Sequence, residues 1–305
     1  MTTPIFENLT LIGIGLIGSS IAHGARKAGL VKNITISTRR EETLKEAENL
    51  NLGDAYTLDM GEAVKEADLI IACVPVGASE AVAKAIAPHL KDGAVLSEVG
   101  SVKRAVINQM QPHIPDHVHF IPGHPIAGTE YSGPSAGFAS LFEGRWQIIT
   151  PVEGTDADAL AKLRAFWEGL GAMVEEMDPD HHDLVLATTS HLPHLIAYNI
   201  VGTAADLEEV TQSEVIKYSA AGFRDFTRIA ASDPTMWRDV FLNNKEAVLE
   251  MLARFSEDLS SLQRAIRWED GDKLFELFSR TRAIRRSIID AGQDVETADF
   301  GRGEG

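Results

Sequence analysis

A glycine turn near the start of the chain, Gly13-x-Gly15-x-x-Gly18, constrains the fold more than any other stretch. It follows an apolar run, residues 9–14, that predicts a buried strand, and it precedes residues 17–28, which predict a helix. Between a strand and a helix, the first glycine permits a tight turn, the second lets the backbone approach a pyrophosphate, and the third allows close packing. The context therefore predicts a dinucleotide-binding turn, which a GxGxxG sequence alone would indicate only weakly.

Strand and helix patterns alternate along the first 178 residues, which predicts an α/β fold with a Rossmann-like, mostly parallel sheet. The further predicted strands are residues 33–37, 56–58, 68–74, 94–97, 118–121, 146–150 and 173–177. The predicted helices between them are residues 41–51, 61–66, 78–90, 102–110 and 156–169. Ligands of such sheets bind outside the carboxyl ends of the strands, so we expect a site at that edge.

Strand patterns end near residue 178, and the rest of the chain predicts only helices and a loose, glycine-rich tail. The helices are residues 182–207, 212–220, 233–256, 256–269 and 273–290, and the tail is residues 297–305. We therefore expect a dinucleotide-binding domain, residues 1–178, followed by an all-helical substrate and dimerisation domain, residues 179–305. Apolar side chains on more than one helix face predict that a second copy of the chain covers them. They are Leu242, Val248, Met251, Leu252, Phe255, Leu259, Leu262 and Ile266.

The charge and the cysteine content narrow the range of partners. With 28 basic and 45 acidic residues the formal net charge is -17, which argues against nucleic acid or an anionic membrane as a partner. An anionic small substrate would then need a local cationic pocket. The single cysteine, Cys73, lies in an apolar run, which predicts a packing role rather than a nucleophile. Neither a secretory segment nor a long apolar run is present, so we expect a cytoplasmic protein.

A second glycine-containing stretch, Gly123-His124-Pro125-Ile126-Ala127-Gly128-Thr129-Glu130, places a histidine where a strand pattern ends and no regular pattern continues. A loop presents a side chain to a ligand in this way, although a capped turn with a solvated histidine explains the octapeptide alone equally well. The loops at residues 74–76 and 98–103 also follow predicted strands, so all three are expected at one edge of the sheet. Their convergence favours a functional His124.

Two clusters in the helical part depart from simple amphipathic patterning. Ser190-His191-Leu192-Pro193-His194 places a proline inside a helical pattern, which costs about 3 kcal/mol unless something offsets it. A kink beside a ligand explains this pattern, and so does a kinked core helix with hydrogen-bonded histidines. Residues 221–228 place two arginines between predicted helices, where they suit a carboxylate ligand or, equally, surface salt bridges.

Taken together, these motifs resemble the prephenate/arogenate (cyclohexadienyl) dehydrogenase family of tyrosine biosynthesis. The resemblance is carried, in order, by residues 123–130, residues 190–194, and residues 222–228 followed by Ser232-Asp233-Pro234-Thr235-Met236-Trp237-Arg238-Asp239. It extends from the glycine turn to about residue 289. The resemblance implies a nucleotide-binding domain followed by a helical domain that forms an intertwined homodimer, in agreement with the patterns above.

The reaction that this resemblance implies is oxidative decarboxylation of prephenate, L-arogenate or both. Hydride leaves the ring carbon that bears the 4-hydroxyl for a nicotinamide nucleotide, and the ring carboxylate departs as CO2. By match of motif, His124 accepts the hydroxyl proton and Ser101 shares a hydrogen bond with that hydroxyl. A neutral imidazole suits this role, because its ordinary pKa is about 6.5. The resemblance also implies that Arg228 binds the ring carboxylate and that His194 and Thr129 line the same pocket. Weaker matches to the substrate pocket are Ser190, Arg224, Asp225 and Trp237.

The expected nucleotide contacts lie in the glycine turn, at the end of the second strand and in the loop after the fourth. They are Gly13, Gly15, Leu16, Ile17, Gly18, Ser37, Thr38, Arg39, Arg40, Val74 and Pro75. An NAD-specific site usually has Asp or Glu at the end of the second strand. This chain has no acid there, and its hydroxyls and arginines suit a 2′-phosphate, which predicts NADP as the preferred cofactor without excluding NAD. Against this prediction, Glu41 and Glu42 follow at once, and both arginines have a second explanation as solvated residues at a helix start.

Several alternatives stay open. Ala220-Ala221-Gly222-Phe223 departs from the Gly-Gly-Gly-Phe of some relatives, which leaves the preference between prephenate and arogenate undecided. Whether tyrosine inhibits is equally open. A reductase of imines or β-hydroxy acids shares the expected fold, but it should lack the histidine stretch and carry a lysine on the helical domain. A dinucleotide-sensing regulatory subunit would need the glycine turn but not His124, Ser101 and Arg228.

Overall fold

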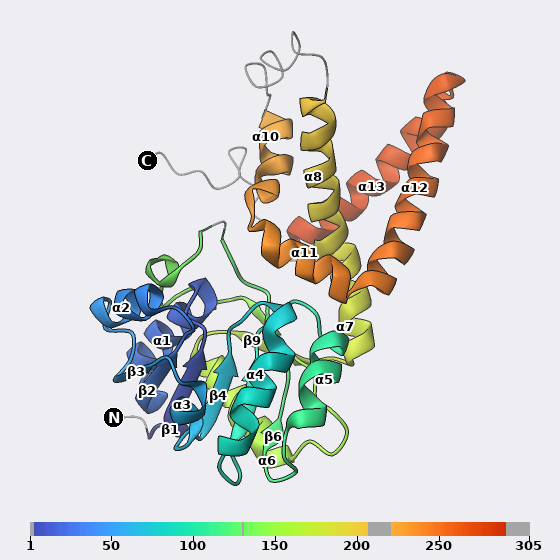
Figure 1. Cartoon of the computed structure of the whole chain (residues 1–305). Helices are drawn as coiled ribbons and strands as arrows, with labels where there is room; N and C mark the ends of the chain where they lie inside the picture. Colours follow the sequence, from blue (N-terminus) through green and yellow to red (C-terminus); the bar gives the residue numbers. More distant parts are fainter. Residues whose placement is uncertain (1–2, 130, 207–220, 291–305) are drawn as a thin grey trace. The chain divides into compact units, whose positions relative to one another are not determined.

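The computed structural model describes residues 3–129, 131–206 and 221–290, in two compact units, Met1–Val248 and Leu249–Gly305 (Figure 1). Glu130, the predicted helix at residues 212–220 and the predicted tail at residues 297–305 lie outside the described residues. In the described part, strands end at Glu176 and only helices follow. The compact units divide after Val248, within the helical part of the chain. The predicted domain boundary after residue 178 stays a prediction.

The first unit is built on a six-stranded sheet in which all neighbouring strands run parallel. Their order is β3-β2-β1-β4-β5-β6, which is the Rossmann order with its switch point between β1 and β4. The strands are β1 (Phe6–Ile12), β2 (Val31–Ser37), β3 (Ala55–Thr57), β4 (Leu69–Ala72), β5 (Val95–Glu98) and β6 (His119–Phe120). The predicted α/β class is therefore confirmed.

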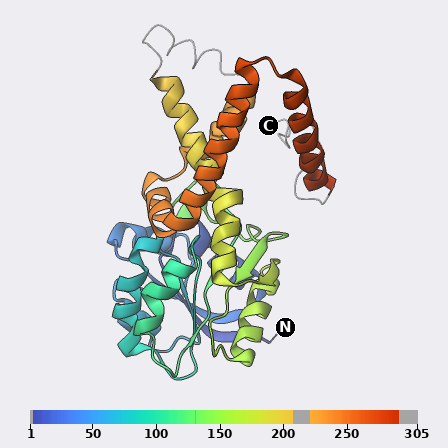
Figure 2. The same cartoon turned by 90° about the vertical axis from the view of Figure 1, so that its right-hand side faces the viewer.

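Helices cover both faces of this sheet (Figures 1 and 2). Because strand side chains alternate, Leu9 and Leu11 of β1 enter one hydrophobic cluster while Ile12 enters the other. Burial on both faces explains why the four residues of β4 are all apolar and all buried. The helices are α1 (Leu16–Ala28), α2 (Glu41–Asn49), α3 (Met60–Val64), α4 (Ser79–Ile86), α5 (Arg104–Met110) and α6 (Ala157–Gly169).

A separate three-stranded sheet corrects the sequence prediction. Here β7 (Gly123–Pro125) pairs antiparallel with β8 (Trp146–Ile149), and β8 pairs parallel with β9 (Met173–Glu176). The sequence pattern assigns the last two strands to the main sheet and His124 to a loop, whereas His124 lies in β7 opposite Ile148. A strand of three residues shows no alternation, and its partner is distant in the chain, so no local pattern contains this pairing.

The glycine turn has the predicted geometry. Gly13 has a φ of +89°, and a β-carbon on it would lie 2.4 Å from the carbonyl oxygen of Cys73. A β-carbon on Gly18 would lie 2.6 Å from the Gly13 carbonyl oxygen, so α1 begins close against the turn. A β-carbon on Gly15 would meet no atom within 4 Å, which leaves room for a phosphate at the N-terminus of α1. The helix ends, as predicted, at a left-handed Gly29.

The helical part accommodates its proline without a break. α7 (Pro179–Leu186) continues through one π-helical turn, Ala187–His191, into α8 (Leu192–Ala205). Pro193 lies in the first turn of α8, directly after the wider π turn, where its missing N–H costs least. The predicted irregularity therefore exists as a π turn, which often marks a functional site.

Two predicted helix limits are wrong. The sequence pattern leaves residues 221–228 between helices, whereas Ala221–Thr227 form α10 and Arg228–Ala231 form a 3-10 turn. It also divides a helix at residue 256, whereas the division lies at Asn244, between α11 (Pro234–Asn243) and α12 (Lys245–Arg267). The Asn244 side chain makes long-range hydrogen bonds with the helical elements around Asp183, and no local pattern contains them.

The second unit consists, in its described part, of residues 249–267 of α12 and of α13 (Gly271–Asp290). Both helices expose large apolar side chains. Those of the two helices are Leu249, Leu259, Ile266, Phe275, Phe278 and Ile284. Of the predicted set, Leu259 and Ile266 are exposed on α12, whereas Val248 is buried in the first unit, and the exposed side chains of α13 were not predicted. An apolar surface of this kind suits burial against another protein surface.

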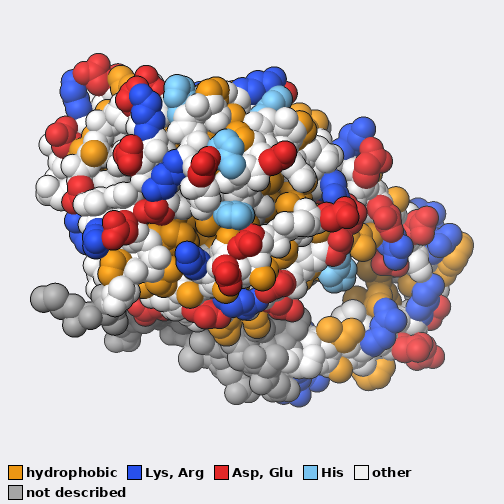
Figure 3. Space-filling model, turned by 90° about the horizontal axis from the view of Figure 1, so that it is seen from below, with side chains coloured by type: hydrophobic (Ala, Val, Ile, Leu, Met, Phe, Trp, Pro, Cys, Tyr) orange, Lys and Arg blue, Asp and Glu red, His pale blue; other side chains and the backbone are white. Residues whose placement is uncertain are grey.

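The polar surface is mixed in sign. On the face drawn in Figure 3, acidic side chains alternate with basic ones rather than separating into large patches of one charge. In the part of the chain that the structure describes, no helix has the length and apolar content needed to cross a membrane.

The glycine turn supports a paired test. Gly13→Ala should lower the free energy of unfolding by about 1 to 3 kcal/mol, because alanine is strained at positive φ and its β-carbon would overlap the Cys73 carbonyl. Gly15→Ala is the control: space is free there, so stability should stay within about 1 kcal/mol while nucleotide affinity falls. Urea denaturation and nucleotide titration measure the two effects. Equal loss of stability in both variants would contradict this account.

Candidate active site

The candidate site lies in the first unit, where the carboxyl ends of β4, β5 and β6 meet α7, α8 and α11. The loop after β4 approaches α11 so closely that a β-carbon on Gly77 would lie 2.8 Å from the carboxylate of Asp239. The loop after β5 is hydrogen-bonded to Asp183 of α7. β7, with His124, follows β6 at the same edge. The predicted convergence of the three segments is therefore confirmed.

A buried ion pair holds the loop after β5 against β7. The carboxylate of Glu98 accepts hydrogen bonds from the backbone N–H of Gly100 at 2.7 Å and of Gly123 at 3.1 Å, and from the ammonium of Lys103. The Lys103 ammonium also donates to the Gly123 carbonyl at 2.5 Å. The two side chains are 3% and 0% exposed. Burial raises the pKa of Glu98 and lowers that of Lys103, and the opposite charge of each partner counteracts these shifts. The network of donors around Glu98 favours the ionised pair.

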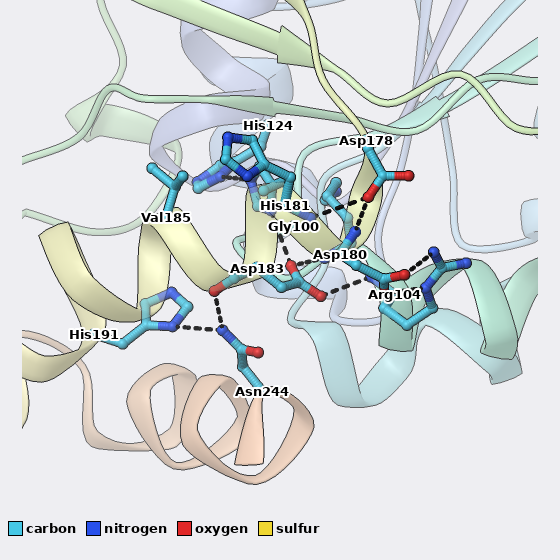
Figure 4. A network of polar contacts seen from close by, with 12 residues as sticks. Gly100, Arg104, His124, Asp178, Asp180, His181, Asp183, Val185, His191 and Asn244 are labelled. Carbon is cyan, nitrogen blue, oxygen red and sulfur yellow. Dashed lines mark hydrogen bonds and ion pairs between the residues drawn. The ribbon is translucent and has the colours of Figure 1, made fainter. Parts of the chain in front are cut away.

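His124 is buried and hydrogen-bonded to a second histidine (Figure 4). Its Nδ1 lies 2.9 Å from Nε2 of His182, and Nδ1 of His182 lies 2.9 Å from Oδ1 of Asp183. Burial lowers the pKa of His124 well below its ordinary value, and a positive charge on His182, when that ring is protonated, on Lys103 or on a protonated His191 acts in the same direction. His124 is therefore a neutral imidazole at neutral pH, as a proton acceptor must be.

Asp183 joins this histidine pair to the loop before α5. Its carboxylate accepts the backbone N–H of Lys103 at 2.7 Å and of Arg104 at 2.9 Å (Figure 4). Its backbone carbonyl accepts a hydrogen bond from Nδ2 of Asn244 at 2.9 Å, and the same Nδ2 lies 3.1 Å from Nδ1 of His191. One aspartate therefore ties together three elements at the site.

Ser101 lies half-buried in the loop between β5 and α5, with its backbone against the ring of His191. Burial lowers the pKa of His191 to about 4, while the charge of Asp183 and the Ser101 backbone oppose the shift. The ring of His191 also influences His124. The same buried histidine, His191, therefore contacts the Ser101 backbone and is close enough to His124 to affect its pKa.

His194 and Trp237 form a second contact near the site. Their rings stack with centroids 3.7 Å apart and 23° between the planes, and Nδ1 of His194 lies 2.8 Å from the Ser190 carbonyl oxygen. Trp237 is 6% exposed and belongs to the hydrophobic cluster on one face of the main sheet. Burial lowers the pKa of His194, and the positive charge of Arg228 acts in the same direction. Arg228 is therefore close enough to His194 for their charges to interact.

The remaining predicted substrate residues lie nearer the surface. Thr129, Arg224 and Arg228 are exposed, whereas Ser190 and Asp225 are half-buried. The hydroxyl of Thr129 accepts a hydrogen bond from the Tyr131 N–H at 3.3 Å, within its own loop. The structure therefore places Thr129 and Arg224 outside the buried histidine network, and their contact with substrate stays a prediction.

The predicted nucleotide contacts fall into two groups. Leu16 and Ile17 begin α1, directly after the glycine turn, and Val74 and Pro75 precede the 3-10 turn Val76–Ala78 at the end of β4. At the end of β2, Ser37 is 0% exposed, and its predicted contact with the nucleotide stays a prediction. Its carbonyl accepts a hydrogen bond from the Gly13 N–H at 2.8 Å, so Ser37 shapes the turn. Thr38 is half-buried and Arg39 and Arg40 are exposed, and their contact with a nucleotide stays a prediction.

The sequence-based site misses the residues that hold it together, namely Glu98, Lys103, His182, Asp183 and Asn244. The available signal is the run Asp178-Pro179-Asp180-His181-His182-Asp183, a cluster of titratable side chains at a helix start. The pattern does not say which of these side chains face the site, because that depends on how α7 packs against the loop before α5.

Family models match most of the chain. The model described as "Prephenate dehydrogenase, nucleotide-binding domain" matches residues 21–176, and the one described as "Prephenate dehydrogenase, dimerization domain" matches residues 178–280. A cyclohexadienyl dehydrogenase from Zymomonas mobilis is 43% identical over 284 residues, which cover 93% of this chain and 97% of that protein.

Solved structures agree with the family models. Prephenate dehydrogenase from A. aeolicus, in complex with hydroxyphenyl propionate and NAD+, is 32% identical with a TM-score of 0.87, covering 94% of this chain and 99% of that one. Arogenate dehydrogenase from Synechocystis is 27% identical with a TM-score of 0.78, covering 92% and 99%.

The buried ion pair can be tested by removing one charge. Lys103→Met should lower the free energy of unfolding by about 3 to 5 kcal/mol, because it leaves the buried Glu98 carboxylate without its counter-charge. The control is Lys84→Met, which breaks a pair with Glu80 whose side chains are 56% and 54% exposed. That variant should unfold at nearly the wild-type urea concentration. Similar urea midpoints for the two variants would show that the buried pair does not brace the loop.

Proposed function

The chain belongs to the prephenate dehydrogenase family, and on that premise we propose that it oxidatively decarboxylates prephenate, L-arogenate or both in tyrosine biosynthesis. As a member of this family it is an NAD(P)-dependent dehydrogenase. The observation that carries the proposal is the buried, neutral His124, which lies at the carboxyl edge of a parallel sheet that also carries the glycine turn.

The glycine turn fits a dinucleotide, because Gly15 leaves open space at the N-terminus of α1, where backbone N–H groups favour a phosphate. When bound, the nicotinamide nucleotide supplies the hydride acceptor. The residues of this chain then have to orient the substrate ring, bind its 4-hydroxyl, and accept and return the proton of that hydroxyl. The loop after β4, with Val74 and Pro75, and the turn at Gly13 border the same edge of the sheet.

His124 manages the proton. Its Nδ1 is hydrogen-bonded to His182, so its Nε2 is the nitrogen that accepts the 4-hydroxyl proton. Hydride leaves the ring carbon that bears this hydroxyl. The bond between the ring and its carboxylate breaks and CO2 departs. The electron pair of that bond stays in the ring and completes its aromatic system. Substrate and products balance without a net proton, so the proton that His124 accepts returns to the phenol oxygen. In this proposal, Ser101 shares a hydrogen bond with that oxygen.

Arg228 binds the ring carboxylate at the other end of the substrate ring. A guanidinium suits a carboxylate because its planar donors bind both oxygens. Its charge acts on His194, which stacks on Trp237, so these three residues form one wall of the pocket. The side-chain end of the substrate, pyruvyl or alanyl, has no assigned partner, and both substrates remain in the proposal.

The chain acts as a homodimer. Support comes from the match to a dimerization-domain model and from the exposed apolar side chains of α12 and α13, such as Leu259 and Phe275. A cytoplasmic location agrees with a single cysteine and with the lack of a membrane-spanning helix among the described residues.

The function and the role of His124 are tested together by absorbance at 340 nm with prephenate or L-arogenate and each nucleotide. Wild type should reduce the nucleotide with at least one substrate. His124→Asn should keep substrate binding but lose about 10²- to 10⁴-fold in kcat, because asparagine can replace Nδ1 towards His182 but offers no base at Nε2. An inactive wild type refutes the function, and a variant within a few-fold of wild type refutes the base.

Arg228→Ala should raise the substrate KM by about tenfold or more, because an ionic contact to the ring carboxylate is lost, while nucleotide affinity stays near wild type. Arg254→Ala is the control, since Arg254 pairs with Glu250 on the surface of α12. Steady-state kinetics with varied substrate and nucleotide separate the two constants. A substrate KM unchanged from wild type would remove Arg228 from the pocket.

The nucleotide preference is tested at the end of β2. We propose that NADP is preferred and that Arg39 contributes more than Arg40, because both are exposed beside Thr38 and no acid occupies the end of the strand. Arg39→Ala should raise the KM for NADP about three- to tenfold, since a charged contact to the 2′-phosphate is lost, and leave that for NAD nearly unchanged. A wild type that favours NAD about tenfold in kcat/KM would exclude this preference.

A further inference from the structure

Three buried side chains form one line from α7 to the proton acceptor in β7. The Asp183 carboxylate lies 2.9 Å from Nδ1 of His182, and Nε2 of His182 lies 2.9 Å from Nδ1 of His124. Their exposed fractions are 6%, 0% and 8%. The planes of the two histidine rings meet at 66°, with centroids 5.1 Å apart, so the rings contact through their nitrogen atoms and do not stack. The line ends at Nε2 of His124, which the proposed reaction uses.

The direction of each hydrogen bond follows from the charge at one end. Asp183 already accepts two backbone N–H groups, from Lys103 and Arg104, and both of these can only donate. An ionised carboxylate accepts and does not donate, so Nδ1 of His182 carries the proton and points it at Asp183. A neutral imidazole carries one N–H, so Nε2 of His182 is an acceptor and Nδ1 of His124 must donate to it.

The tautomer of His124 is therefore set two residues away from the reacting atoms. With its proton on Nδ1, His124 presents a lone pair at Nε2. We propose that His182 and Asp183 are positioning residues that fix the proton-accepting tautomer of His124 and stabilise its imidazolium while the substrate hydroxyl is deprotonated. This inference rests on the proposed function for its kinetic consequences, but the tautomer itself exists without substrate.

The proton balance is simple. The substrate O–H bond breaks, an Nε2–H bond forms on His124, and its Nδ1–H stays hydrogen-bonded to His182. The positive charge on His124 then faces His182, which is itself polarised by the carboxylate of Asp183. When the proton returns to the phenol oxygen, every group regains its starting state.

The charged groups around His124 explain why such support is needed. Burial and the positive charge of Lys103 disfavour a proton on His124, and protonated His182 or His191 would do the same. The Lys103 charge is paired with Glu98 from β5. The carboxylate of Asp183, by contrast, is hydrogen-bonded to His182, the ring that contacts His124. It raises the pKa of His182 against the effect of burial.

Asp183 also has a structural role, because it accepts the N–H groups of Lys103, just before α5, and of Arg104, its first residue. Among the hydrogen bonds of the described residues, the ring of His182 contacts only Asp183 and His124. His182 is therefore the better position for a test. His181, the preceding residue, is exposed and serves as the matched control.

The test compares His182→Leu and His182→Gln with His181→Leu in kinetics over a range of pH. In the wild type, activity falls at low pH as His124 is protonated, and the line of hydrogen bonds raises the pKa at which this happens. Both His182 variants should lose about tenfold or more in kcat with a substrate KM within about twofold. The acid limb should move down by about one pH unit, because a hydrogen bond to the charged imidazole is lost. His181→Leu should match wild type.

A second measurement does not depend on activity. Imidazole ¹⁵N chemical shifts of the wild-type enzyme at neutral pH should show His124 protonated on Nδ1 and His182 protonated on Nδ1. Either ring protonated on Nε2 would overturn the inference, and this result stands even if the His182 variants do not fold.

The two proposals fail in different ways. A wild type without activity on either substrate refutes the function, and the ¹⁵N spectrum still decides the tautomer. An active wild type whose His182 variants keep wild-type kcat, or lose kcat without any shift of the acid limb, overturns the positioning role.

Discussion

The Glu98 carboxylate is the point on which the site depends. It ends β5 of the main sheet, and its oxygens bind the backbone of the following loop and of β7 as well as the Lys103 ammonium. A charge at 3% exposure is stable only with such a complete set of donors, so the loop and β7 have little freedom to move apart. The small second sheet, which positions His124, is thereby attached to the large parallel sheet, which positions the nucleotide turn.

A second carboxylate, that of Asp183, connects the helical elements of the site to the loop before α5. Asp183 accepts the N–H groups of Lys103 and Arg104 at the start of α5 and the Nδ1–H of His182. Its own carbonyl accepts a hydrogen bond from Asn244, between α11 and α12. Because Asn244 also binds His191, whose ring lies against the Ser101 backbone, the end of α11 is connected to the loop that carries Ser101. The result is a site in which sheet residues and helix residues are held by the same few polar groups.

Burial has a chemical consequence for the histidines. His124, His182, His191 and His194 all have lowered pKa values, with burial as the largest cause in each. A lowered pKa keeps the imidazoles neutral at neutral pH, which a proton acceptor requires, but it also weakens the base. Hydrogen bonds aimed at one nitrogen, as from His124 to His182, are a way to recover part of that basicity without exposing the ring to water.

The sequence by itself determined the parallel sheet, the glycine turn and the family. Alternating strand and helix patterns and the spacing of Gly13, Gly15 and Gly18 are local, because each element forms from residues that are neighbours in the chain. His124 was identified as functional by its motif, but not as part of a strand, since β7 exists only by pairing with β8. Likewise, the burial of Ser37 at the end of β2 was not predicted, because it depends on the packed sheet. Only the tertiary structure decided which of two adjacent histidines, His181 or His182, faces the site, because that depends on how α7 packs against the loop before α5.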